Sequence, residues 1–450
     1  MSREVNVADV IDHNPISGSQ IRLFVLCALC LLMDGFDVQV MGFVAPALIE
    51  AWKIPGPALT PVLTAGNLGI LVGALIFTMV ADKIGRRPVL IWATLYFSVM
   101  MVITAQATTI EQLVVLRFIT GLGLGSIIPN ATALIGEFSP KHRRVTLMMA
   151  VSVSFTAGAG FGGFVSLALV PRFGWESVFY FGGLVPLLIA AAMYLWLPES
   201  LQFMVVRNRR PDEVRRVIAG IDPRLGAASD VRFVATEAQK GGVPAMHLFR
   251  DGRTPVTLLL WVVNFMNTLI VYSLSGWMPT IIRNVGYSQQ EAVLVGAILQ
   301  VGGTLGTLAF AGIIPRLGFI PVLAGSFAAG SLVIAAVGWS VPVLGALLFT
   351  VFFAGWCSIG AQPGLNAMSA TFYPTYLRST GIGWALGFAR FGGVVGPIVG
   401  GELLRRQWAP DQLFLAAAVP PVIALIGILA LSRYFGRPAT VGTASPVKAV

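Results

Sequence analysis

Long apolar stretches alternate with short polar segments along the whole chain. About twelve such stretches are present, and each is close to the roughly 20 residues that a helix needs to cross a bilayer. The stretches do not alternate polar and apolar residues, so they exclude a β-barrel and predict membrane-spanning helices. The predicted spans lie near residues 20–49, 60–81, 88–107, 110–136, 145–170, 175–197, 255–282, 288–314, 318–339, 342–368, 378–402 and 410–435.

One long polar stretch, residues 198–254, divides the spans into two sets of six. This arrangement is typical of transporters built from two repeated halves, whose substrate site lies between the halves near the middle of the membrane. We therefore predict an all-α integral membrane protein with two six-helix bundles and a cytoplasmic linker. The predicted domains are an N-terminal tail (1–19), the two bundles (20–197 and 255–435), the linker (198–254) and a C-terminal tail (436–450).

Composition agrees with this prediction, because hydrophobic residues make up 56% of the chain and charged residues only 11%. A soluble protein carries about 25% charged residues. Most of the 30 Lys and Arg fall on the side of the membrane that holds the linker, and the positive-inside rule then places both termini in the cytoplasm. The net charge of +10 is thus a signal of topology rather than of nucleic-acid binding.

Two aspartates, Asp34 and Asp37, interrupt the first apolar stretch. A carboxylate at this depth costs at least roughly 2.5 to 3.5 kcal/mol, and a spacing of three residues places both on one helical face. We interpret them as a proton relay that faces a polar cavity. Arg117 in the fourth span lies at a similar depth, so it is expected to reach one of them. A pair that forms and separates would provide a route for proton uptake and release.

Arg390 is a further charge at membrane depth, about 18 Å inside the eleventh span. No acidic residue of the second half lies at its level, and a guanidinium binds a carboxylate through two parallel hydrogen bonds. We therefore expect Arg390 to bind an anionic substrate. A pair with Asp34 or Asp37 across the bundle interface is an alternative that does not exclude the first role.

Aromatic and amide side chains near the same depth are candidates for the remaining substrate contacts. Aromatic rings in spans usually serve packing, whereas amides are costly when they face lipid and so indicate either a cavity or a contact between helices. The candidates are Phe36, Trp356, Trp384 and Phe388 among the rings and Asn264, Asn267 and Gln300 among the amides.

The loop after the second span carries Asp82, Gly85, Arg86 and Arg87. We interpret these residues as a conformational latch, in which Gly85 permits a tight turn and the charges pair with neighbouring helix ends. The alternative is that the arginines only set the topology. The segment is similar to the G-x-x-x-D-R-x-G-R-R signature of the major facilitator superfamily, with Thr78 and Lys83 as departures from it, and residues 315–318 form a degenerate second copy.

Further motifs resemble those of the aromatic acid:proton symporter family within that superfamily. This resemblance implies uptake of benzoate-type acids such as 4-hydroxybenzoate or protocatechuate, driven by the proton gradient across the bacterial inner membrane. The motifs are Asp34–Asp37, Gly66–Leu75, Pro129–Thr132 and Tyr373–Gly381. The family's functional positions match Asp34, Asp37, Arg117, Glu137, Arg378 and Arg390. Glu137 and Arg378 lie at the cytoplasmic ends of their spans and are assigned to the latch, where Glu137 is expected to pair with Arg86 or with Arg143 and Arg144.

The sequence also bears on two other classes of protein, antiporters and enzymes. The glycine run at residues 158–163 is similar to a motif of antiporters, although packing of glycines between helices explains it as well. His13, His142 and His247 all lie in cytoplasmic segments, so no enzyme site or metal cluster is expected. We expect a monomer that uses protons as the coupling ion, contains no cofactor and binds no nucleic acid.

Overall fold

The computed structural model describes residues 3–207, 211–227, 231–235, 245–373 and 377–435. Within these residues, 12 helical segments are long and apolar enough to cross a membrane. The predicted all-α membrane fold is therefore confirmed. The predicted C-terminal tail (436–450) lies outside the described residues.

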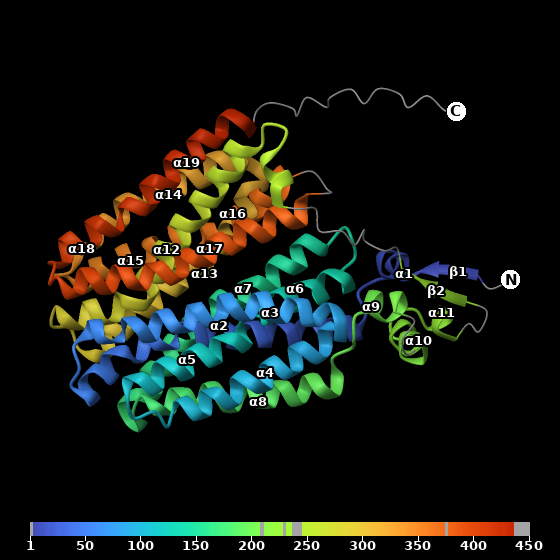
Figure 1. Ribbon diagram of the computed structural model, residues 1–450, viewed down its shortest axis with the longest axis horizontal. Coiled ribbons are helices and arrows are strands. Elements are labelled where there is room, and N and C mark those ends of the chain that lie inside the picture. Colours follow the sequence, from blue (N-terminus) through green and yellow to red (C-terminus); the bar gives the residue numbers. More distant parts are fainter. Residues whose placement is uncertain (1–2, 208–210, 228–230, 236–244, 374–376, 436–450) are drawn as a thin grey trace.

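The first six spans form an N-terminal bundle, which occupies the lower half of Figure 1. Its fourth span is divided into two helices, and the short 3-10 helix Gly56–Leu59 joins the first two spans. The spans are α2 (Gly18–Trp52), α3 (Thr60–Ile84), α4 (Arg86–Thr104), α5 with α6 (Ile110–Leu124 and Ile127–Phe138), α7 (Arg144–Phe173) and α8 (Glu176–Trp196).

The last six spans form a C-terminal bundle in the upper half of the same view. The 3-10 helix Ala245–Phe249 precedes it. Its spans are α12 (Thr254–Asn284), α13 (Gln289–Leu317), α14 (Phe319–Ser340), α15 with α16 (Leu344–Ser358 and Ala361–Phe372), α17 (Arg378–Arg405) and α18 with α19 (Pro410–Ala417 and Val419–Phe435).

The two bundles repeat each other in detail. The fourth and tenth spans both break after a helix of 15 residues and continue as a helix of 12 residues. Gly85 and Gly318 occupy equivalent turns after α3 and α13, with φ angles of +106° and +86°. Only glycine adopts such angles readily, so the two turns require the same residue at the same place. The structure thus supports an internal repeat that the sequence indicates only weakly.

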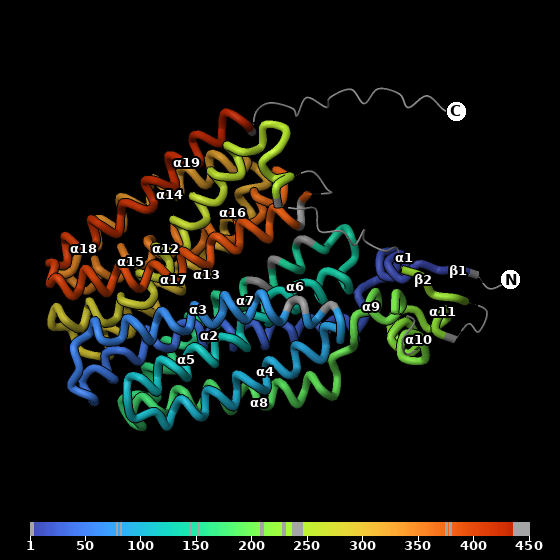
Figure 2. Tube along the Cα trace, in the orientation of Figure 1, coloured from blue at the N-terminus to red at the C-terminus, as the bar shows by residue number. Residues whose placement is uncertain are grey.

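A small domain is formed by the N-terminal tail together with part of the linker, and we call it the tail–linker domain. Strands β1 (Arg3–Asn6) and β2 (Val231–Val234) pair in parallel within it. Its helices are α1 (Val7–His13), α9 (Leu201–Val206), α10 (Pro211–Ala219) and α11 (Pro223–Ala227), grouped beyond one end of the N-terminal bundle in Figure 2. We call this end of the molecule the linker end and the opposite end the distal end.

The tail–linker domain is anchored to the N-terminal bundle. Nζ of Lys141, in the loop between α6 and α7, lies 3.1 Å from Oδ2 of Asp12. The backbone N–H of Lys141 also donates to Asp12 at 2.8 Å, and Ser19 at the start of α2 donates to the carbonyl of Gly220 in the linker at 3.4 Å. The tail and the linker, which the sequence presents as two separate polar segments, are therefore parts of one unit.

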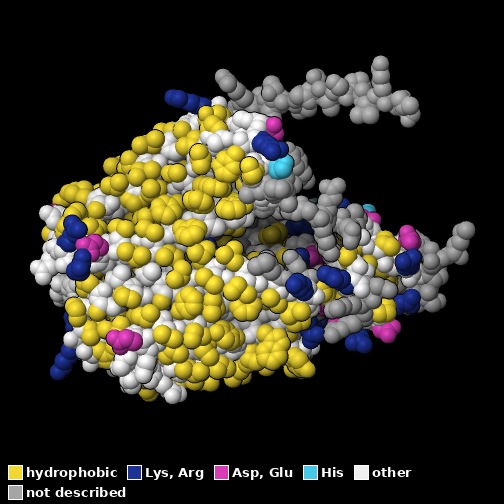
Figure 3. Space-filling model, viewed as in Figure 1, with side chains coloured by type: hydrophobic (Ala, Val, Ile, Leu, Met, Phe, Trp, Pro, Cys, Tyr) yellow, Lys and Arg dark blue, Asp and Glu magenta, His cyan; other side chains and the backbone are white. Residues whose placement is uncertain are grey.

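The two bundles are closely packed at the distal end and separate toward the linker end (Figure 1). At the distal end Arg283 of α12 lies 3.3 Å from Glu50 of α2, and a Cβ placed on Gly401 would overlap the side chain of Thr60. Figure 3 shows a hollow between the bundles on the side of the tail–linker domain. The structure is thus closed at the distal end and open at the linker end.

Candidate functional site

Asp34 and Asp37 lie in the middle of α2, where both side chains are buried. Gly35 between them marks the closest approach of α2 to α7, because a Cβ at this position would overlap the carbonyl oxygen of Phe155. Gly158 of α7 fits against the carbonyl of Leu32 in the same way. The glycine run in α7 therefore serves helix packing on two sides, with Gly158 against α2 and Gly163 against Ala297 of α13 in the other bundle.

Asp37 is paired with Arg117 of α5, as the depths of the two residues predict. Nη1 of Arg117 donates to Oδ1 of Asp37 at 2.8 Å, and Nη2 donates to Oδ2 at 3.3 Å and to the backbone carbonyl at 3.0 Å. Arg117 is only 4% exposed and Asp37 is fully buried. The charge of Asp37 is thus compensated within the N-terminal bundle.

Asp34 lies one turn away from Asp37 and has a different environment. It is 2% exposed, and its Oδ2 has no hydrogen-bond partner among the described residues. The charged groups that act on it are Arg390 of α17, which attracts it, and Asp37, which repels it. Tyr272 of α12 experiences the charges of both Arg390 and Asp34, so side chains from three helices and both bundles share this region.

Arg390 is half-buried and makes no ion pair within 4 Å among the residues that the structure describes. The alternative expectation was an ion pair between Arg390 and Asp34 or Asp37. The described residues form no such pair, and Arg390 instead attracts Asp34 over a longer distance. The five N–H donors of the guanidinium are then available to an anion at the bundle interface.

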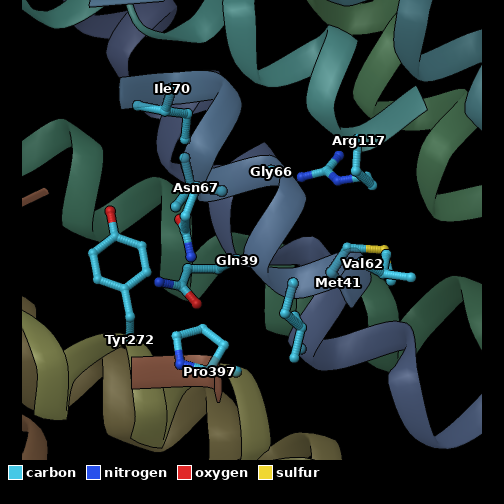
Figure 4. Close-up of a pocket in the computed structure, with 13 residues that line it drawn as sticks. Gln39, Met41, Val62, Gly66, Asn67, Ile70, Arg117, Tyr272 and Pro397 are labelled. Carbon is cyan, nitrogen blue, oxygen red and sulfur yellow. The ribbon is translucent and has the colours of Figure 1, made fainter. Parts of the chain in front are cut away.

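A cavity of about 20 Å³ lies at the interface on the distal side of Asp34. Gln39, Asn67, Arg117, Tyr272 and Pro397 are among its lining residues, and Gln39, Asn67 and Tyr272 gather on one side of it in Figure 4. This volume holds about one water molecule. Asn67 also donates across the interface to the carbonyl of Gly393 at 2.9 Å. The path from Asp34 to the distal end is therefore closed in this conformation.

The amides predicted to line a cavity belong to a network that the sequence analysis only partly identifies. Gln362 of α16 accepts from Asn267 at 2.8 Å and from Thr268 at 3.3 Å, and it donates to Asn264 at 3.3 Å and to Asn366 at 3.2 Å. Gln362 and Asn366 were not predicted, although they lie in the polar turns directly after the break in the tenth span. The oxygen of Asn267 has no partner among the described residues.

Gln300 lies apart from this network. It donates to the hydroxyl of Ser275 at 2.9 Å, and its Cβ lies 3.5 Å from the position that a Cβ would take on Gly160. Gln300 therefore joins α13 to α12 and lies beside α7 of the other bundle, so it forms part of the bundle interface.

The four predicted aromatic residues occupy three different places. Phe36 is fully buried within the N-terminal bundle, with ring centroids 5.7 Å from Phe181 and 6.3 Å from Phe161. Trp356 packs among phenylalanines of the C-terminal bundle. The structure thus brings neither ring to Arg390.

Trp384 and Phe388 both stack on one other ring, that of Trp261 in α12. The centroid distances are 5.6 Å for Trp384 and 4.2 Å for Phe388. Both residues precede Arg390 in α17 by less than two turns, so they lie on its linker side. Trp261 was not predicted, and its Nε1 has no partner among the described residues.

The predicted latch forms around Gly85, at the turn between α3 and α4. Arg86 forms an ion pair with Glu137 of α6, as the sequence indicated. The carboxylate that holds the turn itself is Glu199, which accepts from the backbone N–H groups of Arg86 at 3.0 Å and Arg87 at 3.1 Å. Glu199 was not predicted, because nothing in its sequence position, three residues after the end of α8, indicates this contact.

The structure describes the contacts of some of the other latch residues. Ser200 donates to Glu137, and the side chain of Arg87 donates to the backbone carbonyl of Tyr194 at 2.6 Å. Asp82 lies in α3 and Arg378 begins α17, but their side chains are outside the described part of the structure. Within the described residues no group of three His, Cys, Asp or Glu side chains could hold a metal ion.

Two repeated bundles with an interface site that contains charged residues at membrane depth define a secondary transporter. The profile of the Major Facilitator Superfamily matches residues 27–349 and 260–449. The chain belongs to this superfamily and, within it, to the family of aromatic acid transporters that its motifs predict. It is accordingly a transporter and not an enzyme.

Relatives and solved structures agree with this assignment. The 4-hydroxybenzoate transporter PcaK of Pseudomonas putida is 37% identical over 436 residues, which cover 95% of this chain and 96% of the relative. The gallate transporter of the same species is 37% identical over 427 residues, with 95% of each chain covered. The crystal structure of a D-xylose-proton symporter has a TM-score of 0.71 at 15% identity, covers 94% of this chain and 99% of its own, and so supports the fold alone.

Proposed function

We propose that the protein is a proton-coupled symporter that imports an aromatic carboxylate, such as 4-hydroxybenzoate, protocatechuate or benzoate, by alternating access. The observation that carries this proposal is the pair of charges at the bundle interface, Asp34 and Arg390, each without an ion-pair partner within 4 Å among the described residues. Relatives that carry 4-hydroxybenzoate and gallate support the aromatic class, because both substrates are ring carboxylates.

In this proposal Arg390 binds the substrate carboxylate. Phe388, two residues before Arg390 in α17, stacks on Trp261, and this pair of rings lies on the linker side of Arg390. The amides around Gln362 belong to α12 and α16 of the same bundle, and the unpartnered oxygen of Asn267 can accept a hydrogen bond from a ring hydroxyl.

The coupling proton is assigned to Asp34 rather than to Asp37. Asp37 already has an ion-pair partner in Arg117, whereas ionised Asp34 would compete with a substrate carboxylate for Arg390 and repel it. Protonation of Asp34 removes this competition, so the substrate and the proton favour each other's binding. When both the substrate and the proton are bound, fewer uncompensated charges have to be desolvated as the bundles move.

The proposed location is the bacterial inner membrane, with the linker end and both termini in the cytoplasm. The basic residues of the chain support this orientation through the positive-inside rule. The conformation described above is then open to the cytoplasm. We further propose that the protein acts as a monomer and that the proton is the coupling ion, with no cofactor.

The test is uptake of radiolabelled 4-hydroxybenzoate into proteoliposomes with an imposed inward proton gradient. We expect accumulation that collapses with a protonophore and is inhibited by unlabelled benzoate and protocatechuate but not by quinate or glucose. Inhibition by quinate alone would instead indicate a non-aromatic organic acid. Accumulation driven only by an opposed proton gradient would indicate an antiporter, the other mechanism that this fold supports.

The variant Asp34→Asn isolates the coupling step. It should lose gradient-driven accumulation while it retains exchange of labelled for unlabelled substrate, because exchange requires no net movement of protons. Glu111→Gln is the control, since it also removes one carboxylate of the N-terminal bundle, but at an exposed position in the first turn of α5. Uphill accumulation by the Asp34→Asn variant would refute the assignment of the proton to Asp34.

A further inference from the structure

The adjacent residues Arg86 and Arg87 have different surroundings. Arg86 turns toward the carboxylate of Glu137. Arg87 donates from Nη2 to the backbone carbonyl of Tyr194 in α8, and no carboxylate lies within 4 Å of its guanidinium among the described residues. Its Nε is buried without a hydrogen-bond partner. Among the described latch side chains, none therefore brings a carboxylate to the guanidinium of Arg87.

The guanidinium of Arg87 lies at one end of a groove of about 640 Å³ between α4 and α8. Apart from this charge the lining is hydrophobic, with Trp92, Leu188 and Tyr194 each at least 67% exposed. The groove spans residues 87–95 of α4 and 187–195 of α8, which is about 12 Å along each helix.

The groove opens on the outer side of the N-terminal bundle, away from the interface. In Figure 1 α4 and α8 form the edge of the molecule farthest from the C-terminal bundle. Hydrophobic side chains cover most of this region in Figure 3, and Lys and Arg side chains gather toward the linker end. In a membrane this face contacts lipid. Tyr194 and Trp196 are exposed at the linker end of α8, where aromatic residues mark the level of the headgroups.

We propose that this groove is a binding site for one anionic phospholipid of the leaflet at the linker end. The guanidinium of Arg87 binds the phosphate, and an acyl chain lies along the groove between α4 and α8. The planar donors of arginine match the geometry of a phosphate. No carboxylate lines the groove, so the cationic headgroup of a zwitterionic lipid has no partner there, whereas the net charge of an anionic lipid complements Arg87.

The experiment is native mass spectrometry of the delipidated full-length protein, titrated with phosphatidylglycerol or phosphatidylcholine. We expect one phosphatidylglycerol to bind at least severalfold more tightly than phosphatidylcholine. Arg87→Gln should weaken the binding of phosphatidylglycerol roughly fivefold, the effect of one basic residue at a lipid surface. Arg22→Gln is the matched control, because Arg22 is an exposed arginine of α2 at the same end that does not line the groove.

A second variant tests the groove without a change in charge. Ala191→Phe places a ring at an exposed position of the lining and should weaken binding of phosphatidylglycerol, while melting in the absence of lipid stays unchanged. Equal binding of the two lipids, or equal loss in the Arg87→Gln and Arg22→Gln variants, would overturn the proposal. Normal binding of phosphatidylglycerol by Ala191→Phe would overturn the placement of the acyl chain.

Discussion

Arg117 donates hydrogen bonds to both carboxylate oxygens and to the backbone carbonyl of Asp37, and Asp37 has no exposed surface. Removal of Arg117 therefore leaves a buried charge without compensation. We expect Arg117→Gln to lower stability by roughly 3–5 kcal/mol, the usual cost of breaking one side of a buried pair. Thermal melting of the purified variant in detergent measures the loss.

The double variant Arg117→Gln with Asp37→Asn is the control, because it removes both charges together. It should melt above the single Arg117→Gln variant, since no isolated charge remains. If the single and double variants melt at the same temperature, the pair contributes through packing rather than through charge.

Arg390 should distinguish carboxylates from neutral analogues of the same shape. We expect Arg390→Gln to weaken 4-hydroxybenzoate binding about 10- to 100-fold, because hydrogen bonds to charged groups contribute roughly 1.5–3 kcal/mol. Binding of 4-hydroxybenzamide should change little, since it carries no charge to lose. Calorimetric titration of both ligands measures the difference, and an equal loss for both would place the carboxylate elsewhere.

Gln362 connects α16 to α12 through three hydrogen bonds and makes a fourth to Asn366 within α16. Gln362→Leu should lower the melting temperature, because the side chains of Asn264, Asn267 and Thr268 lose a buried partner, and each unsatisfied group costs about 1–3 kcal/mol. Asn366→Leu, which removes a single bond of the same network, should have a smaller effect. The reverse order would show that Asn366 and not Gln362 is the centre of the network.

Thr60 and Gly401 touch across the bundle interface at the distal end. Cysteines at both positions should form a disulfide on oxidation and block transport, and reduction should restore it, because alternating access requires this contact to open. Either single cysteine variant is the control, and the native cysteines Cys27, Cys30 and Cys357 are all buried. Full transport by the oxidised double variant would show that the distal contact does not need to separate.

Asp12 should make the attachment of the tail–linker domain sensitive to acid. Burial alone raises its pKa, but the hydrogen bonds and charge of Lys141, together with the charge of Arg144, hold the pKa of Asp12 below its usual value. Because the folded pKa is the lower one, the stabilisation is present at neutral pH and is lost as the pH falls below about 4. Hydrogen exchange of residues 3–13 should therefore accelerate, after correction for the intrinsic rate, between pH 7 and pH 3.

The variant Asp12→Asn provides the comparison. It should exchange at pH 7 as the unmodified protein does at pH 3 and should show no further effect of acid. Strong residual acid sensitivity in this variant would assign the effect to another carboxylate.

The sequence predicts the fold and a pair between Arg117 and one of the two aspartates, Asp34 or Asp37, because both predictions depend on simple lengths. A span needs about 20 residues, and two residues at similar depths on neighbouring helices can meet if one has a long side chain. Even the pairing of Arg86 with Glu137 follows from their common position at the ends of spans.

Contacts that depend on the packing of helices could not be predicted in this way. Phe36 and Asp37 are neighbours in the sequence, yet the 100° rotation per residue turns the Phe36 ring toward Phe161 and Phe181 inside the N-terminal bundle. Glu199 was missed because its partners are backbone N–H groups, which every residue carries. Strand β1 was missed because four residues give no pattern that identifies a partner more than 200 positions away.

The pairing of β1 with β2 has a consequence for how the chain is made. Residues 3–6 are synthesised first, but their hydrogen-bonding partners, residues 231–234, follow only after all six spans of the N-terminal bundle. The ribosome must therefore have completed half of the protein before its earliest residues can fold. The pairing of β1 with β2 therefore joins the tail to the linker only after every span of the N-terminal bundle has been made.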